Sequence, residues 1–226
     1  MTGRRLIGVV GGMGVQATAH FYNILHDLQS VDIEQDYADV LVYSKPSIPD
    51  RTTYILNVDK PSPVPHLLDA VQLLERAGVG CIAIPCVTSH VWHDELSRAT
   101  CLPILHMPRA AADMVAGLTR VGLLATSGTL CMKLFHNAMQ GTQIIEPSEC
   151  EQAELMEYIY NIKKGYPADP ERLAAFANAL RGRGAQVVML GCTELSVAAD
   201  GKLDGYIDPL VALAHAALRA TRESAA

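Results

Sequence analysis

The sequence predicts an α/β protein that consists of two similar halves with parallel sheets. Short apolar segments of strand length alternate with longer segments of helical periodicity along the chain. The strand-like segments are nearly all apolar, which is typical of parallel strands buried on both faces. The same order of elements occurs twice, and 226 residues are enough for two small cores. We therefore expect parallel sheets joined by right-handed helical crossovers.

Six segments are expected to form the strands. Each is short, mostly apolar and bounded by residues that favour turns or caps. In chain order they are Leu6–Val10, Val40–Tyr43, Cys81–Ile84, Val121–Leu124, Gln143–Ile145 and Val187–Leu190.

Eight helices are expected between and after these strands. Asp169 precedes Pro170, and Asp208 precedes Pro209, so that a capping side chain stands before a first-turn proline. Ser148 stands in the same way before two glutamates. The expected helices lie near residues 15–29, 65–77, 89–98, 107–117, 129–139, 149–161, 170–181 and 209–223.

An internal duplication relates the two halves. Ile7–Gly14 aligns with Val121–Gly128, since each is a strand, a turn of small residues and the start of a helix. Gly78–Val91 aligns with Gly184–Val197 at a constant offset of 106 residues. The second alignment places Cys86 over Cys192, each just past the end of an apolar strand.

Composition excludes several classes of protein. The formal net charge is −6 and the basic residues are scattered, so we expect no nucleic-acid partner. No run of about 18 apolar residues suggests a transmembrane helix, and no signal peptide precedes the first strand. We therefore expect a cytoplasmic protein. The six cysteines form no CxxC pair and match no zinc spacing, so we expect neither metal site nor disulfide.

The matched cysteines indicate proton-transfer chemistry. Ligands of open parallel sheets bind outside the carboxyl ends of the strands, where both Cys86 and Cys192 are expected. Two thiols on opposite sides of one cleft could remove a proton from one face of a carbon and deliver one to the other. A helix follows each cysteine, and we expect its N-terminus to lower the thiol pKa from about 8.5 toward neutral. Such a pair would invert a stereocentre beside a carboxylate.

Six motifs in order resemble the aspartate/glutamate racemase superfamily, and most closely its cofactor-independent aspartate racemase branch. They cover most of the chain and are specific for the family, though less so for its substrate. They are Gly11–Gly14, Ser47–Thr52, Pro85-Cys86 with Thr88 and His90, Gly122–Thr129, Ile162–Gly165 and Leu190–Leu195.

The resemblance implies two pseudo-symmetric Rossmann-like domains with the active site in the cleft between them. The first domain would comprise residues 1–105 and the second residues 106–207. The C-terminal helix, residues 208–226, would pack back on the first domain. The resemblance also implies a homodimer that acts on a small-molecule amino acid without a cofactor or metal.

The resemblance further implies roles for individual residues. Cys86 and Cys192 would be the acid/base thiols, and Arg51 would bind a substrate carboxylate through its planar fork. Lys164, with Lys163 as the alternative, would lie near the distal carboxylate, and Glu194 would orient Cys192 or the substrate amine. Other substrate-binding residues would be Met13 and Gln16, which line the cleft, and the donors Thr88, Thr126 and Thr193.

Val87 departs from the family pattern, in which Asn usually follows the first cysteine. Valine lacks the donors and acceptor of asparagine, a loss that costs about 1–3 kcal/mol where a group is left unpaired. We expect a racemase of aspartate or glutamate. The alternatives are a racemase of another amino acid, a related hydantoin racemase, decarboxylase or maleate-type isomerase, and a non-catalytic binding protein.

Overall fold

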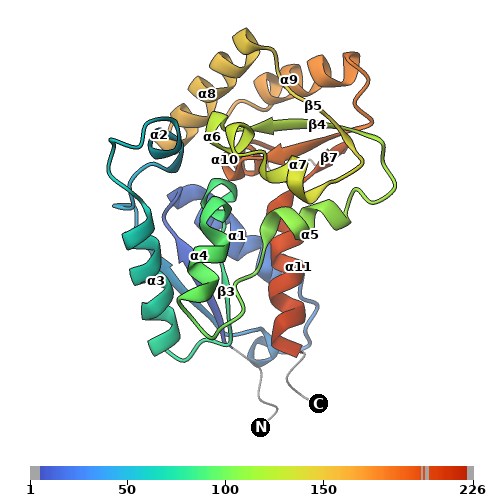
Figure 1. Ribbon diagram of the computed structural model, residues 1–226. Coiled ribbons are helices and arrows are strands. Elements are labelled where there is room, and N and C mark those ends of the chain that lie inside the picture. The colour runs from blue at the N-terminus through green and yellow to red at the C-terminus, as the bar shows by residue number, and fades with distance from the viewer. Residues whose placement is uncertain (1–5, 200, 202–203, 223–226) are drawn as a thin grey trace.

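The computed structural model describes residues 6–199, 201 and 204–222 and has two lobes, each with a parallel sheet (Figure 1). The first lobe contains the sheet β2-β1-β3 and the second lobe the sheet β5-β4-β6-β7. All pairings between these strands are parallel. The strands are β1 (Ile7–Gly11), β2 (Val40–Ser44), β3 (Cys81–Ala83), β4 (Arg120–Ala125), β5 (Gln143–Ile145), β6 (Val187–Gly191) and β7 (Tyr206–Ile207). The predicted fold class is therefore confirmed.

The two sheets repeat one arrangement. The first strand of each lobe, β1 or β4, lies between the next two strands of the chain, one on each side. In the second lobe β7 then adds to β6. In the first lobe a single parallel bridge between Ile82 and Ile104 occupies the corresponding place beside β3. The duplication seen in the sequence thus reappears in the strand order.

Helices connect the strands and cover the sheets. In the first lobe they are α1 (Val15–Asp27), α2 (Arg51–Leu56), α3 (Val64–Arg76) and α4 (His93–Arg98), with 3-10 turns η1 (Glu34–Asp36) and η2 (Val87–Trp92). Those that follow are α5 (Met107–Asp113), α6 (Ser127–Cys131), α7 (Leu134–Ala138), α8 (Glu149–Lys163), α9 (Pro170–Gly182), α10 (Thr193–Ala199) and α11 (Pro209–Arg222).

The C-terminal helix α11 links the core of the molecule. Its buried side chains, including Leu210 and Leu213, belong to a cluster that also holds Val9 of β1 and Val121 of β4. α11 packs against α1, α5 and β3 (Figure 1). α5, which begins just after the proposed domain boundary between residues 105 and 106, contacts both α11 and α7. That boundary therefore stays a prediction. Residues 223–226 of the predicted C-terminal segment lie outside the described residues.

Some predicted elements differ from those observed. The predicted helix 89–98 begins as the 3-10 turn η2, and the predicted helix 129–139 is divided into α6 and α7. Lys133 separates these two with a left-handed φ of 52°. The helix predicted at 107–117 ends at Asp113. The sequence did not predict α2, α10 or β7, because each is too short for a periodic pattern to stand out.

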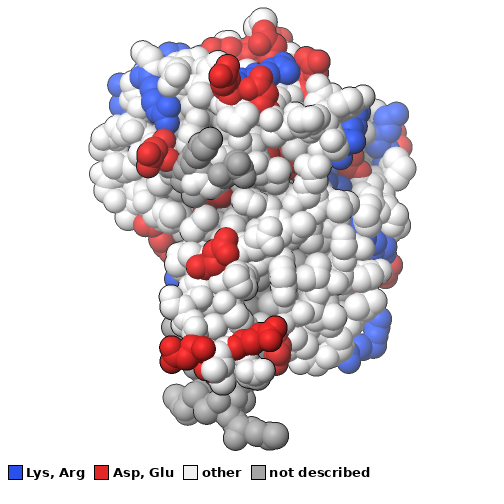
Figure 2. Space-filling model, turned by 180° about the vertical axis from the view of Figure 1, so that it is seen from behind, with Lys and Arg blue, Asp and Glu red and all other residues white. Residues whose placement is uncertain are grey.

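The surface agrees with the charge pattern of the sequence. On the face seen from behind, basic and acidic side chains intermingle, and no continuous basic band crosses it (Figure 2). Within the part of the chain that the structure describes, no helix has the length and apolar character needed to cross a membrane.

Gly128 allows the two lobes to approach closely. A Cβ atom at this position would lie 2.9 Å from Thr52 Oγ1 and 3.0 Å from Thr52 Cα, where α6 meets α2. We therefore expect Gly128→Ala to lower the free energy of unfolding by about 1–3 kcal/mol through overpacking. Urea denaturation measures the change.

Gly182→Ala in α9 is the matched control, because a Cβ there meets nothing within 4 Å. It should be neutral or stabilising by about 0.4–1 kcal/mol. Equal stability changes in the two variants would contradict the close approach.

Candidate active site

The candidate site lies where the carboxyl ends of both sheets face each other, as expected for parallel α/β sheets. Met13 follows β1, Cys86 follows β3, Thr126 follows β4 and Cys192 follows β6. The cavity that they enclose measures about 10 Å³, which is room for about one water. Its lining comprises Met13, Asp50, Arg51, Thr52, Cys86, Val87, Thr88, Thr126, Tyr160, Lys163, Cys192, Thr193 and Glu194.

Arg51 stands on the first turn of α2, and its guanidinium group faces Cys86. Asp50 caps this helix by accepting a hydrogen bond from the Thr53 amide, which fixes where the helix begins. The guanidinium donates to the carbonyl oxygens of Pro49 at 3.0 Å and Met13 at 3.1 Å. Burial acts to lower the pKa of Arg51, but attraction to Cys86 and Asp50 and a hydrogen bond to Cys86 raise it. A permanent cation therefore lies beside the first cysteine.

Cys192 has an anion beside it instead. Its thiol donates to Glu194 Oε2 at 3.0 Å, and Glu194 is only 2% exposed. The other carboxylate oxygen, Oε1, accepts from Lys163 Nζ at 2.9 Å. Lys163 Nζ also donates to the Met13 carbonyl at 3.3 Å. Burial acts to lower the pKa of Lys163, but Glu194 and the cysteines raise it, so the ammonium group stays charged.

The expectation that a helix N-terminus lowers both thiol pKa values is wrong for Cys192. Burial raises the pKa of this thiol well above its ordinary value, and the neighbouring charge of Glu194 raises it further. Lys163 acts in the opposite direction but does not outweigh these effects. Cys192 is therefore a protonated thiol at neutral pH.

Three threonine hydroxyls form a triangle across the junction of the lobes. Thr88 Oγ1, from the first lobe, lies 3.0 Å from Thr126 Oγ1 and 3.0 Å from Thr129 Oγ1. Thr126 also caps α6 by accepting from the Thr129 amide at 3.2 Å. Thr193 lines the cleft from the start of α10 and is buried. These hydroxyls offer donors that can reorient toward a carboxylate.

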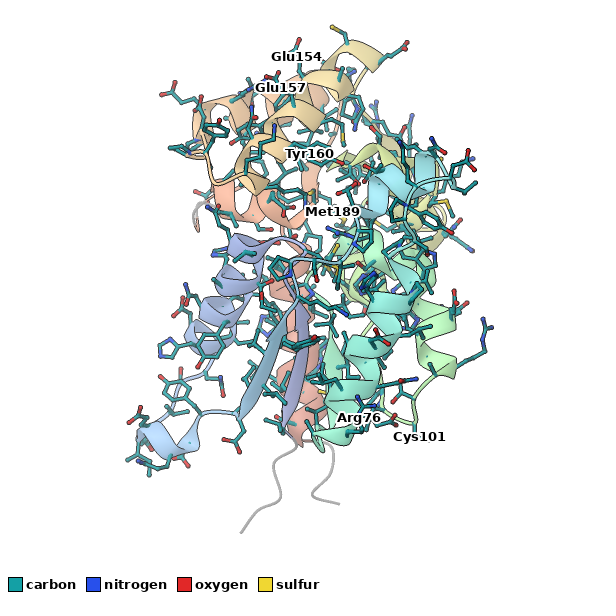
Figure 3. The ribbon with its side chains drawn as sticks, turned by 90° about the vertical axis from the view of Figure 1, so that its left-hand side faces the viewer. Arg76, Cys101, Glu154, Glu157, Tyr160 and Met189 are labelled. Carbon is teal, nitrogen blue, oxygen red and sulfur yellow. The ribbon has the colours of Figure 1, made fainter. Side chains whose placement is uncertain are left out.

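A hydrogen bond from Tyr160 to Asp50 joins the lobes at the edge of the site. The Tyr160 hydroxyl, on α8, donates to Asp50 Oδ1 at 2.9 Å. Tyr160 lies closer to the first lobe than Glu154 and Glu157, which stand further out along the same helix (Figure 3). Burial and the Asp50 carboxylate raise the pKa of Tyr160 to about 12, so the phenol remains a donor.

Most predicted site residues meet in this cleft, whereas Gln16 and Lys164 do not. Both are exposed and line a neighbouring hollow beside the end of α8. Lys163, the alternative to Lys164, reaches the cleft instead. Sequence reasoning gave no role to Thr129 or Asp50, although both lie within the quoted motifs. It also missed Tyr160, for which the sequence carried no separate signal.

The sequence of the chain matches a known protein family. The profile of the Asp/Glu/hydantoin racemase family matches residues 10–221. The chain belongs to this family. The broad specificity amino-acid racemase RacX of Bacillus subtilis (strain 168) is 25% identical over 207 residues, covering 86% of this chain and 88% of that protein. The chain is accordingly an amino-acid racemase, an isomerase that acts on a small molecule.

Solved structures of related racemases share the fold. An aspartate racemase from Picrophilus torridus superimposes with a TM-score of 0.84 and 26% identity, covering 96% of this chain and 94% of that one. A glutamate racemase from Francisella tularensis subsp. tularensis, solved in complex with D-glutamate, gives a TM-score of 0.72 at 18% identity. It covers 97% of this chain and 82% of that chain, and at this identity it supports the fold alone.

Tyr160→Phe should destabilise the protein in a pH-dependent way. Hydrogen bonds and the charge of Arg51 hold the pKa of Asp50 below its ordinary value despite its burial. The ionised carboxylate therefore stabilises the fold at neutral pH, and this contribution is lost as pH falls through its lowered pKa. We expect Tyr160→Phe to lower the free energy of unfolding by about 1 kcal/mol at neutral pH.

The loss should shrink in acid, as the pH falls through the lowered pKa of Asp50 and the carboxylate becomes protonated. Chemical denaturation at several pH values measures it. Tyr166→Phe, which alters an exposed tyrosine, is the control. A loss that did not vary with pH would argue against the bond to an ionised Asp50.

Proposed function

We propose that this racemase acts on an acidic amino acid, aspartate or glutamate, without a cofactor, by proton transfer at Cα between Cys86 and Cys192. One observation carries the proposal: the two cysteines occupy duplicated positions after β3 and β6 and line the same cavity from the two lobes. A thiol on each side of a bound amino acid is the arrangement that inversion of a stereocentre requires. General acid–base groups in such positions contribute about 10²–10⁴-fold to rate.

The charges beside the two cysteines differ. A cation, Arg51, lies beside Cys86, whereas Glu194 and burial raise the pKa of Cys192 and favour a thiol there. In the forward direction the Cys86 thiolate takes the Cα proton and becomes a thiol. The Cys192 thiol then gives its proton to the opposite face of the carbanion and becomes a thiolate. The reverse reaction exchanges these roles.

The cations of the cleft support an acidic substrate. Arg51 and Lys163 both lie in the lining, and both are held by the carbonyl oxygen of Met13. A guanidinium group binds a carboxylate in a bidentate manner, and an ammonium group adds a second positive charge. The threonine triangle and Thr193 supply further donors for the carboxylate beside the carbon that loses its proton.

Val87 favours a second candidate, a racemase of another or of several amino acids. Its side chain is 2% exposed, lines the cleft and offers no hydrogen bond, where relatives usually have Asn. The similarity to a broad-specificity racemase supports this candidate. The homodimer and the cytoplasmic location remain predictions of the sequence.

The reaction can be tested with single enantiomers in heavy water. We expect the wild-type protein to place deuterium at Cα of aspartate or glutamate and to invert its configuration. Cys86→Ser and Cys192→Ser should each lower racemisation at least about 10²-fold, because each removes one of the two acid/base groups. Mass spectrometry and chiral chromatography measure both events.

Cys131→Ser, which alters an exposed cysteine, is the matched control and should keep full activity. Inversion of other amino acids alone would favour the second candidate. Full racemisation by either Cys86→Ser or Cys192→Ser would exclude the two-thiol mechanism.

Alkylation of Cys192 should show the raised pKa directly. Only the thiolate reacts, so we expect iodoacetamide to modify Cys192 half-maximally well above about pH 8.5, the value for a free thiol. Glu194→Gln removes the neighbouring negative charge and should move this midpoint to lower pH. Peptide mass spectrometry measures the modification of each cysteine separately. An unchanged midpoint in Glu194→Gln would show that the carboxylate does not control the thiol.

A further inference from the structure

A second hollow lies behind the cleft, on the other side of the Lys163–Glu194 ion pair. It measures about 230 Å³ and is lined by the start of α1, the end of α8 and Glu194. Lys163 and Glu194 belong to the linings of both the hollow and the cleft. The substrate side of Cys192 and this hollow are therefore connected through one carboxylate.

Two hydrogen bonds hold the Glu194 carboxylate between Cys192 and Lys163. Oε2 accepts from the Cys192 thiol at 3.0 Å, and Oε1 accepts from Lys163 Nζ at 2.9 Å. Gly14, which lines the hollow, leaves room for this carboxylate, since a Cβ there would lie 2.6 Å from Oε1. The carboxylate is thus held with one oxygen on the thiol and the other toward the hollow.

Cys86 has no equivalent connection among the described residues. The ionic neighbours given for Cys86 are the cations Arg51 and Lys163, which stay protonated and cannot accept a proton. Arg51 is itself buried and bonded to backbone carbonyl groups. The two thiols occupy duplicated positions and are equally buried, but within the described chain only Cys192 has a carboxylate as its hydrogen-bond partner.

We propose that Glu194 relays protons between the Cys192 thiol and water in the second hollow. In one direction Cys192 gives its proton to the Glu194 carboxylate and becomes a thiolate. Glu194, now a carboxylic acid, then gives the proton to water. The reverse path reprotonates Cys192 after it has delivered its own proton to the carbanion. No electron is transferred and no further reactant is needed.

The relay has a consequence for turnover that rests on the proposed function. After one inversion Cys86 is a thiol and Cys192 is a thiolate, so the enzyme is in the opposite protonation state. The relay returns Cys192 to the thiol with the cleft closed. Cys86 loses the proton it took from the substrate only when the cleft opens. A proton taken by Cys192 exchanges with solvent, whereas one taken by Cys86 is retained.

Infrared spectroscopy tests the relay without any substrate. The S–H band of Cys192 is the difference between the wild-type spectrum and that of Cys192→Ser, and its replacement by S–D is followed after dilution into heavy water. We expect Glu194→Gln to slow this exchange at least about tenfold, because a positioned acid–base group contributes about 10²–10⁴-fold to proton transfer. An exchange rate equal to that of the wild type would overturn the proposal.

Glu154→Gln is the matched control. Glu154 lies 3.9 Å from Cys150 Sγ on the exposed part of α8, so it forms a cysteine–glutamate pair outside the site (Figure 3). It should leave the exchange rate of Cys192 unchanged. If Glu194→Gln does not fold, Glu194→Asp keeps the charge but draws the carboxylate back by one methylene group. Slower exchange in this variant supports the relay, and an unchanged rate overturns it.

A second measurement uses L-aspartate and D-aspartate separately in heavy water. We expect deuterium in the recovered starting enantiomer for one of the two only, the one whose proton Cys192 takes. Glu194→Gln should abolish this exchange while inversion persists at a reduced rate. Equal exchange from both enantiomers would overturn the relay. Turnover of neither enantiomer together with Glu194-dependent S–H exchange would refute the proposed substrate but keep the relay.

Discussion

The carbonyl oxygen of Met13 is the point on which the charged groups of the site converge. It accepts hydrogen bonds from Arg51 and Lys163, which come from different lobes. The preceding residue, Gly12, has a φ of 91°, and a Cβ atom there would lie 2.6 Å from the backbone of Lys45. The glycine turn therefore directs one backbone carbonyl group toward a buried guanidinium group and a partly buried ammonium group. Each cation also interacts with a second group. Arg51 faces Cys86, and Lys163 forms an ion pair with Glu194.

The duplicated scaffold thus carries an asymmetric set of charges. Strand order places Cys86 and Cys192 at equivalent positions, and symmetry alone would give the two thiols equal acidity. The neighbouring side chains remove this equality, because a guanidinium group accompanies one thiol and a carboxylate the other. The proposed two-base reaction needs one thiol ionised and one protonated at the start. The different neighbours distinguish the two positions before any substrate binds.

The sequence predicted the fold well because strand hydrophobicity and the internal repeat are local signals. It placed every strand except β7, which has two residues. It predicted one helix at 129–139 where the structure has α6 and α7, because Lys133 gives no composition cue for its left-handed backbone. The matched positions of the two cysteines in the duplicated halves also predicted that both would lie in one cleft.

Side-chain direction was less predictable from the sequence. Lys163 is the last residue of α8 and Lys164 is its C-cap, so only the direction in which the end of the helix points decides which one enters the cleft. Gln16 illustrates the same limit on α1, where it lies on the exposed face. The raised pKa of Cys192 depends on burial and on Glu194 together, and no pattern in the sequence measures either.

The small size of the central cavity implies that selection of the substrate takes place before chemistry. An amino acid does not fit in about 10 Å³, so the residues around the cleft must move to admit it, and Tyr160–Asp50 and Lys163–Met13 are among the contacts that hold the lobes together there. Conformational steps of this kind often limit the turnover of enzymes. These contacts are compatible only with a substrate whose shape and charge let the lobes pack together. The polar contacts between the lobes then contribute to specificity as much as the groups that touch the reacting carbon.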